Sequence, residues 1–235
     1  MVLALTPIFL ILLGLIPSVT WLFFYLHEDM KHPKPILAVL LTFLVGCAVT
    51  FLVLPVEIFA NEWFIRIGFP LYTIGSFLVL AAIEEVFKFF GAFVSIGQSR
   101  WFQEPMDAMI YAITVALGFA AVENIASLFK ASDGSFLNID VIESLILRFV
   151  GATLLHSLAG GIAGYYWGKS FFKPAFKWGY IAFGLILVTA LHAVFNRLII
   201  DEGRFGGPAG LAIVFVSFVM FFVLSDFEKF KRVDR

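Results

Sequence analysis

The chain has 235 residues, of which 61% are hydrophobic and 14% charged, and its formal net charge is -1. A soluble domain carries roughly 25% charged residues, so this composition excludes a soluble globular protein and predicts a surface that faces the lipid bilayer. No basic patch or aromatic stacking module is present, so a nucleic-acid partner is not expected. The single cysteine, Cys47, excludes disulfides and cysteine-based metal sites.

Seven apolar segments reach the length of about 20 residues that a helix needs to cross the hydrocarbon core. In chain order they lie near 3–25, 36–57, 69–95, 108–129, 139–168, 179–200 and 208–225. The sequence therefore predicts an all-α fold, a polytopic transmembrane helical bundle of about seven to eight spans, because a break in the charged segment 69–95 would make the count even. No internal repeat or long linker is visible, so we expect one integral membrane domain over 1–235.

The distribution of lysine and arginine predicts the orientation of the bundle. Ten of these residues fall in one alternating set of loops and tails, and four fall in the other. Because positive residues accumulate on the cytoplasmic side, we expect the N-terminus outside and the C-terminal tail in the cytoplasm.

The segment 69–95 contains charged residues that are costly inside a membrane. A charge near the bilayer centre costs at least about 2.5–3.5 kcal/mol, so an ionisable residue at this depth indicates a functional site. Glu84 and Lys88 are four residues apart and share one helix face, whereas Glu85 lies about 100° around the helix. One lysine cannot neutralise two buried carboxylates, which favours a chemical role for the glutamates over simple ion pairing. Lys88 is expected to be a supporting residue that tunes these acids.

Three later segments also carry polar residues well inside their apolar runs. Glu123 and Asn124 lie in 108–129, and His156 lies in 139–168. His192 and Asn196 are four residues apart in 179–200 and share one helix face. All of these positions lie at comparable depth, so we expect them to converge on one buried polar cavity with the glutamates.

Such a cavity suits hydrolysis of a carbonyl compound. Glu84 or Glu85, with a pKa raised by burial and by the neighbouring acid, can take a proton from water. His192 and Asn196 can donate hydrogen bonds to the oxyanion of a tetrahedral intermediate. Asn196 could equally be a packing amide, and the same two interpretations stay open for Asn124.

A metal-dependent variant uses the same residues. Glu123 and His156 either orient the attacking water or join a glutamate and His192 as ligands of a zinc ion. No HExxH motif is present, so no cofactor is certain and zinc at Glu123, His156 and His192 remains an alternative. Arg148 is expected to pair with Glu143 or with a lipid headgroup.

Four motifs together resemble a known family. They are Glu84-Glu85-x-x-Lys88, Phe119-x-x-x-Glu123 followed by Asn124, His156-x-x-x-Gly160 and His192-x-x-x-Asn196. Their order and span positions are similar to those of the PrsW family of intramembrane glutamate/histidine proteases, which is related to the CAAX prenyl endopeptidases of the ABI superfamily. The similarity covers a motif-bearing core at about 80–200.

The resemblance implies a multi-pass endopeptidase of the bacterial cytoplasmic membrane whose first motif supplies the catalytic glutamates. It further implies a membrane-anchored protein or peptide as substrate, with site-1 cleavage of an anti-sigma factor or a similar regulator as the expected reaction. Where the CAAX relatives end the second motif in histidine, this chain has Glu123, which leaves open whether a metal is needed. The main alternative is a proton- or cation-coupled transporter or channel that uses the same buried acids and histidines. A membrane scaffold without catalytic activity is a further possibility.

Overall fold

The structure is a computed structural model that describes residues 2–29, 33–133, 138–205 and 210–233. The described residues form helices and no strand. The long helices are α1 (Val2–Glu28), α2 (Ile36–Arg66), α3 (Ile74–Ile96), α4 (Pro105–Ala131), α7 (Lys177–Phe205) and α8 (Gly210–Val233). Between α4 and α7 lie α5 (Ile139–Leu147), a π-helical turn (Arg148–Ala152), α6 (Thr153–Lys169) and a short 3-10 turn (Pro174–Phe176).

The predicted helical membrane bundle is confirmed. Within the described ranges, six helical segments are long and apolar enough to cross a membrane: Thr6–Glu28, Ile36–Arg66, Pro105–Ala131, Ile139–Lys169, Pro174–Ile199 and Gly210–Phe230. The remaining predicted span corresponds to α3, which is one unbroken helix of 23 residues, but its charged residues Glu84, Glu85 and Lys88 lie close together near its middle. Its charged side chains are buried against neighbouring helices. Packing against protein therefore lets α3 keep charges that lipid would not accept.

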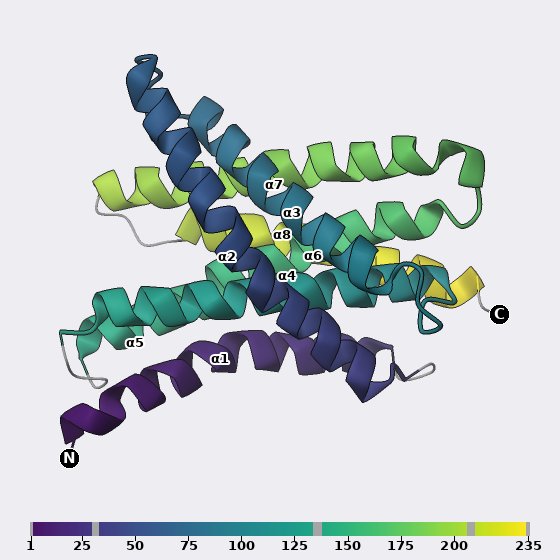
Figure 1. Cartoon of the computed structure of the whole chain (residues 1–235), viewed down its shortest axis with the longest axis horizontal. Coiled ribbons are helices and arrows are strands. Elements are labelled where there is room, and N and C mark those ends of the chain that lie inside the picture. Colours follow the sequence, from purple (N-terminus) through teal and green to yellow (C-terminus); the bar gives the residue numbers. More distant parts are fainter. Residues whose placement is uncertain (1, 30–32, 134–137, 206–209, 234–235) are drawn as a thin grey trace.

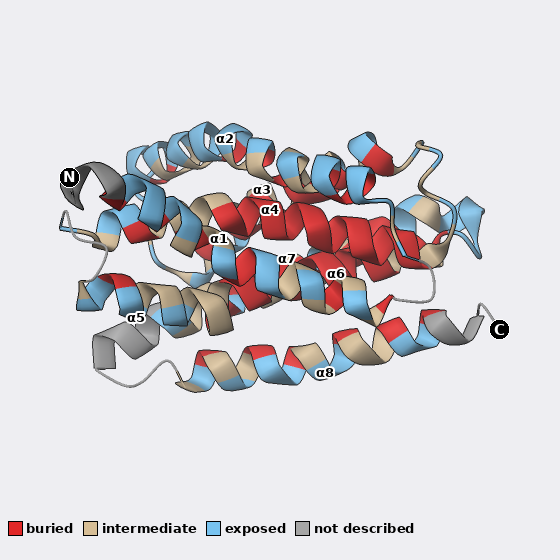
Figure 2. Cartoon of the chain, turned by 90° about the horizontal axis from the view of Figure 1, so that it is seen from below, coloured by how far each residue is buried: buried red, intermediate tan, exposed pale blue. Residues whose placement is uncertain are grey.

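Helix α4 forms the centre of the bundle, and α6 packs along it. Figure 1 shows α2 and α3 crossing obliquely over α4, with α1 and α7 on opposite sides of it. In Figure 2 the buried residues concentrate on α4 and α6, while α2 and α8 present mainly exposed or half-buried residues. Large apolar side chains on these outer helices, such as Phe51 and Phe221, are exposed, as a lipid-facing surface requires.

Small residues allow α6 to approach α4 at backbone distance. A Cβ atom added to Gly164 would lie 2.5 Å from the carbonyl oxygen of Ala108 and 2.5 Å from the Cα atom of Met109. Gly160 and Gly168, one turn away on either side, lie equally close to the backbone of α4. This glycine stripe sets the rotation and depth of α6, because membrane helices associate mainly through close van der Waals packing.

The Gly164→Ala substitution is expected to destabilise the protein, because the new methyl group would have to push two backbones apart. Overpacking of this kind costs about 1–3 kcal/mol, which lowers the Tm of a chain of this size by roughly 2–12 °C. The matched control is Gly179→Ala on α7, where an added Cβ meets no atom within 4 Å. Thermal unfolding in detergent should separate the two variants, and equal Tm values would contradict backbone-to-backbone packing.

A buried ion cluster ties α1 and the α1–α2 loop to the start of α4. The Nζ atom of Lys34 lies 3.0 Å from Asp29, 2.6 Å from Asp107 and within ion-pair distance of Glu104. Asp107 also accepts hydrogen bonds from the backbone N–H groups of Gln103 and Glu104, so it caps α4. Burial opposes the charge of Lys34, but its hydrogen bonds to Asp107 and Glu104 outweigh burial and raise the pKa of the ammonium. The cluster therefore holds one end of the bundle together.

Candidate active site

Helix α3 supplies three charged side chains to the interior of the bundle. Glu84, Glu85 and Lys88 are each less than 10% exposed, on the part of α3 that packs against α4, α6 and α7. The Nζ atom of Lys88 lies 2.6 Å from Oε1 of Glu85 and 3.3 Å from Oε2 of Glu84. The lysine is therefore bound more tightly to Glu85 than to Glu84, and it pairs with both acids on its own helix.

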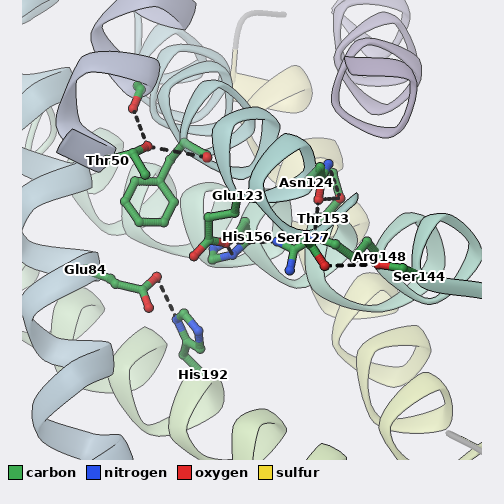
Figure 3. A network of polar contacts seen from close by, with 12 residues as sticks. Thr50, Glu84, Glu123, Asn124, Ser127, Ser144, Arg148, Thr153, His156 and His192 are labelled. Carbon is green, nitrogen blue, oxygen red and sulfur yellow. Dashed lines mark hydrogen bonds and ion pairs between the residues drawn. The ribbon is translucent and has the colours of Figure 1, made fainter. Parts of the chain in front are cut away.

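His192 reaches the same glutamates from α7. Its Nδ1 atom lies 2.7 Å from Oε1 of Glu85 and 3.9 Å from Oε2 of Glu84. Figure 3 shows Glu84 and His192 pointing toward each other from facing helices. Because Glu85 also binds Lys88, its carboxylate is more restrained than that of Glu84. Glu84 makes only the longer contacts.

His156 on α6 lies between Lys88 and a third carboxylate. Its Nδ1 atom is 3.0 Å from Nζ of Lys88, and its Nε2 atom is 2.8 Å from Oε2 of Glu123. An ammonium only donates hydrogen bonds, so Nδ1 accepts and the ring proton belongs on Nε2, where it is donated to Glu123. These two contacts define both the orientation and the tautomer of His156.

Glu123 and Asn124 on α4 are held by the π-helical turn that precedes α6. Arg148 donates from Nη2 to Oε2 of Glu123 at 3.1 Å and from Nε to Oδ1 of Asn124. Asn124 in turn donates to the hydroxyl of Thr153 at 3.0 Å. Figure 3 shows this chain of contacts running from Glu123 to Arg148. The side chains of Glu123 and Arg148 are 30% and 20% exposed, so the site is more open here than at Glu85.

The expected pairing of Arg148 with Glu143 or a headgroup is wrong, because the arginine turns inward to Glu123. Its presence inside an apolar segment was the signal that an inward partner existed. The π-helical turn adds a residue to the helix at this point, which is a frequent device at functional sites.

Glu57 is a residue near the site that the sequence did not single out. Its segment was expected to end there, but α2 continues to Arg66 and carries Glu57 as a half-buried helical residue. Glu57 lies within electrostatic range of Glu84 and Glu123. It thus adds a further acid to the rim of the site.

Asn196 lies one turn along α7 from His192 and is half-buried. Its side chain has no hydrogen-bond partner in the part of the chain that the structure describes, in contrast to Asn124. An amide with free donors at the edge of a polar site remains available to a ligand. The packing interpretation therefore fits Asn124 better than Asn196.

Four of the predicted site residues converge closely enough to hold one metal ion. Glu84, Glu85, His156 and His192 each offer a ligand atom, and these atoms lie within 4.8 Å of one another. Two carboxylates and two imidazoles are a suitable donor set for zinc. The Lys88 ammonium lies among the same donor atoms. Glu123, which the sequence placed in a zinc set with the histidines, lies instead beyond His156 and contacts its Nε2 atom.

Comparison with known proteins identifies relatives over most of the chain. The model of the family described as PrsW family intramembrane metalloprotease matches residues 34–225, a range that contains every residue of this site. The Protease PrsW of Geobacillus kaustophilus is 29% identical over 203 residues, which cover 86% of this chain and 84% of the relative. That of Oceanobacillus iheyensis is 27% identical over 221 residues, with 94% of both chains covered. That of Bacillus subtilis is 26% identical over 189 residues, covering 79% of this chain and 80% of the relative. No solved structure matches this chain significantly.

Proposed function

Because this chain belongs to the PrsW family of intramembrane metalloproteases, we propose that it hydrolyses a peptide bond of a membrane-anchored protein with water activated by a buried glutamate. The observation that carries this proposal is the meeting of Glu84, Glu85, His156 and His192, from three separate helices, in one buried cluster. The resemblance of the motifs and the names of the relatives support the same activity. Neither a matching relative nor a feature of the described residues favours the transporter alternative.

Glu84 is the general base in this proposal. Its carboxylate lies 3.3 Å from Nζ of Lys88 and 3.9 Å from Nδ1 of His192. Lys88 and His192 both make their shorter carboxylate contact with Glu85. A base has to exchange its proton with water, which requires a carboxylate that is not locked into ion pairs. The Glu84 side chain is also 10% exposed against 3% for Glu85, so water reaches it more easily.

Glu85, His156 and His192 are the residues that would hold a zinc ion, leaving Glu84 free to act as the base. Catalytic zinc sites usually use three protein ligands and keep one position open. Zinc, when bound, lowers the pKa of water and polarises a carbonyl group. Glu123 would then orient the ligand His156, because it accepts a hydrogen bond from the Nε2–H group of that histidine.

Asn196 is the proposed donor to the oxyanion that forms when water attacks the carbonyl carbon. Its free amide and its position one turn from His192 suit this role. The half-open rim formed by Glu57, Glu123 and Arg148 supports entry of the peptide from this side. His192, which the sequence suggested as a second oxyanion donor, is not given that role here, because its Nδ1 atom already contacts Oε1 of Glu85.

The biological setting is proposed from the resemblance and from the charge of the loops. We place the enzyme as a single domain, 1–235, in the bacterial cytoplasmic membrane with its C-terminal tail in the cytoplasm. The proposed substrate is an anti-sigma factor or a similar membrane-anchored regulator that receives its first cleavage here. A membrane-anchored substrate lies in the same bilayer as the enzyme, which suits an active site embedded in lipid.

Cleavage of single-span peptides by the purified protein in detergent tests the proposed function. We expect the wild type to cleave a subset of a peptide library and His192→Ala to cleave the same peptides at least about 10²-fold more slowly, as for loss of one catalytic group. The control is His27→Ala, which removes an exposed imidazole at the end of α1. Mass spectrometry of the products gives the rates, and undiminished cleavage by His192→Ala would remove this site from the reaction.

Removal of metal belongs to the same assay. Treatment with a chelator is expected to stop cleavage, and added zinc is expected to restore it. Cleavage that survives chelation would favour a metal-free glutamate mechanism on the same residues.

A further inference from the structure

Lys88 occupies an unusual place for a positive charge. Its Nζ atom contacts Glu85 at 2.6 Å, His156 at 3.0 Å and Glu84 at 3.3 Å, which are three of the four residues whose ligand atoms converge. The side chain is 3% exposed, and no other described lysine or arginine contacts these three residues. An ammonium ion thus stands where the donor atoms of a metal site face one another.

The same contacts show what Lys88 does for the cluster. Two carboxylates that are buried side by side repel each other, and leaving them without a cation is costly. The neighbouring cation, Arg148, is already paired with Glu123. Lys88 also donates to the Nδ1 lone pair of His156, which is the lone pair on the side of the glutamates. The lysine therefore neutralises the acids and blocks a histidine donor atom at the same time.

We propose that Lys88 is a built-in competitor of the metal, whose ammonium holds the metal-free site together and has to withdraw when a divalent cation binds. The proposal rests on the function proposed above, because it concerns the same donor set. A cation at Glu85 and His156 would need the two donor atoms that now bind Nζ. Both positive charges cannot share these atoms, so binding is an exchange of one cation for another.

Two neighbours can hold the ammonium of Lys88 after it leaves Glu85 and His156. Its stem has four rotatable methylene groups, and Nζ already lies 4.7 Å from the centre of the Phe119 ring, whose face attracts a cation. Glu84, one turn earlier on α3, can keep its ion pair while Nζ leaves Glu85 and His156. The exchange that we propose is a change of the Lys88 side-chain rotamer.

Zinc affinity of Lys88→Met tests the exchange. The full-length protein is purified in detergent, stripped with a chelator and titrated with zinc chloride against a chromophoric competitor. We expect the dissociation constant for zinc to fall at least tenfold in Lys88→Met, because methionine fills a similar volume without competing for the donor atoms. We also expect metal-free Lys88→Met to have a lower Tm than the wild type and zinc to raise that Tm by more.

A second lysine provides a matched control. The side chain of Lys34 is 5% exposed, against 3% for Lys88, and it pairs with three carboxylates. It lies in the α1–α2 loop beside the start of α4 and contacts no histidine among the described residues. Lys34→Met should leave zinc affinity unchanged, and an equal gain in this variant would overturn the specific role of Lys88. If Lys88→Met does not fold, Lys88→Gln, which keeps a polar side chain, replaces it in the same titration.

Two further results decide the proposal. An unchanged or weaker zinc affinity in Lys88→Met overturns it, since a purely structural lysine would orient the ligands and help binding. Peptide cleavage that continues in a chelator while no variant binds zinc also overturns it, and in that case the peptidase function stands. Zinc binding that is tightened by Lys88→Met and lost in Glu85→Gln/His192→Ala supports it, whatever the rate of cleavage.

Discussion

Glu84→Gln is expected to reduce peptide-bond hydrolysis by about 10²–10⁴-fold in kcat while leaving the fold intact. Glutamine has nearly the same shape as glutamate but cannot accept the proton of the attacking water. The contacts of Glu84 to Lys88 and His192 are long, so their loss disturbs little else. Single-turnover cleavage of a single-span peptide gives the rate, and thermal unfolding reports the fold.

The control for this variant is Glu62→Gln, which makes the same chemical change at an exposed position of α2. It should cleave like the wild type. Zinc content separates the two proposed roles of the glutamates, because Glu84→Gln should retain the metal. Loss of zinc together with activity would make Glu84 a ligand instead of the base.

Glu85→Ala is expected to cause the largest loss of stability among the site variants. Glu85 is 3% exposed and binds both Lys88 and His192. Its removal leaves the buried ammonium with a single carboxylate, Glu84 at 3.3 Å, and takes from His192 its shorter carboxylate contact. Breaking a buried ion pair from one side costs about 3–5 kcal/mol. For a chain of this size, such a loss lowers Tm by roughly 6–20 °C.

The double variant Glu85→Ala/Lys88→Met tests the cause of this loss. Removing both charges should recover part of the lost stability, because no unpaired ammonium is left behind. Glu143→Ala, on the exposed face of α5, serves as the control and should unfold like the wild type. A double variant that is less stable than Glu85→Ala would show that Lys88 is not the source of the penalty.

The helical membrane bundle followed from hydropathy alone, because each span is a local run of apolar residues and the bilayer sets its length. The polar site followed almost as directly. Ionisable residues inside apolar segments are rare, so Glu84, Glu85, His156 and His192 stood out as candidates. The structure then brings these four together in one cluster.

The end of α2 illustrates a limit of the same reasoning. Glu57 interrupts an apolar run, which placed the predicted end of the span there, yet the helix continues to Arg66. The carboxyl group is half-buried and lies within electrostatic range of Glu84 and Glu123, so it faces the polar site and not the lipid. Hydropathy describes only a local stretch of sequence. The environment that decides whether a charged residue fits inside a helix is formed by other helices.

Three features thus followed from the types of residues and their order along the chain. They are the membrane bundle, the set of buried acids and imidazoles, and membership of a peptidase family. Which atoms of those residues meet was decided only by tertiary structure. The central position of Lys88 depends on how α3 packs against α6. The placing of Glu123 behind His156 and the inward turn of Arg148 depend on how α4 and α6 are rotated against each other. That rotation comes from backbone contacts at glycines such as Gly164, and such contacts exist only once the helices have packed.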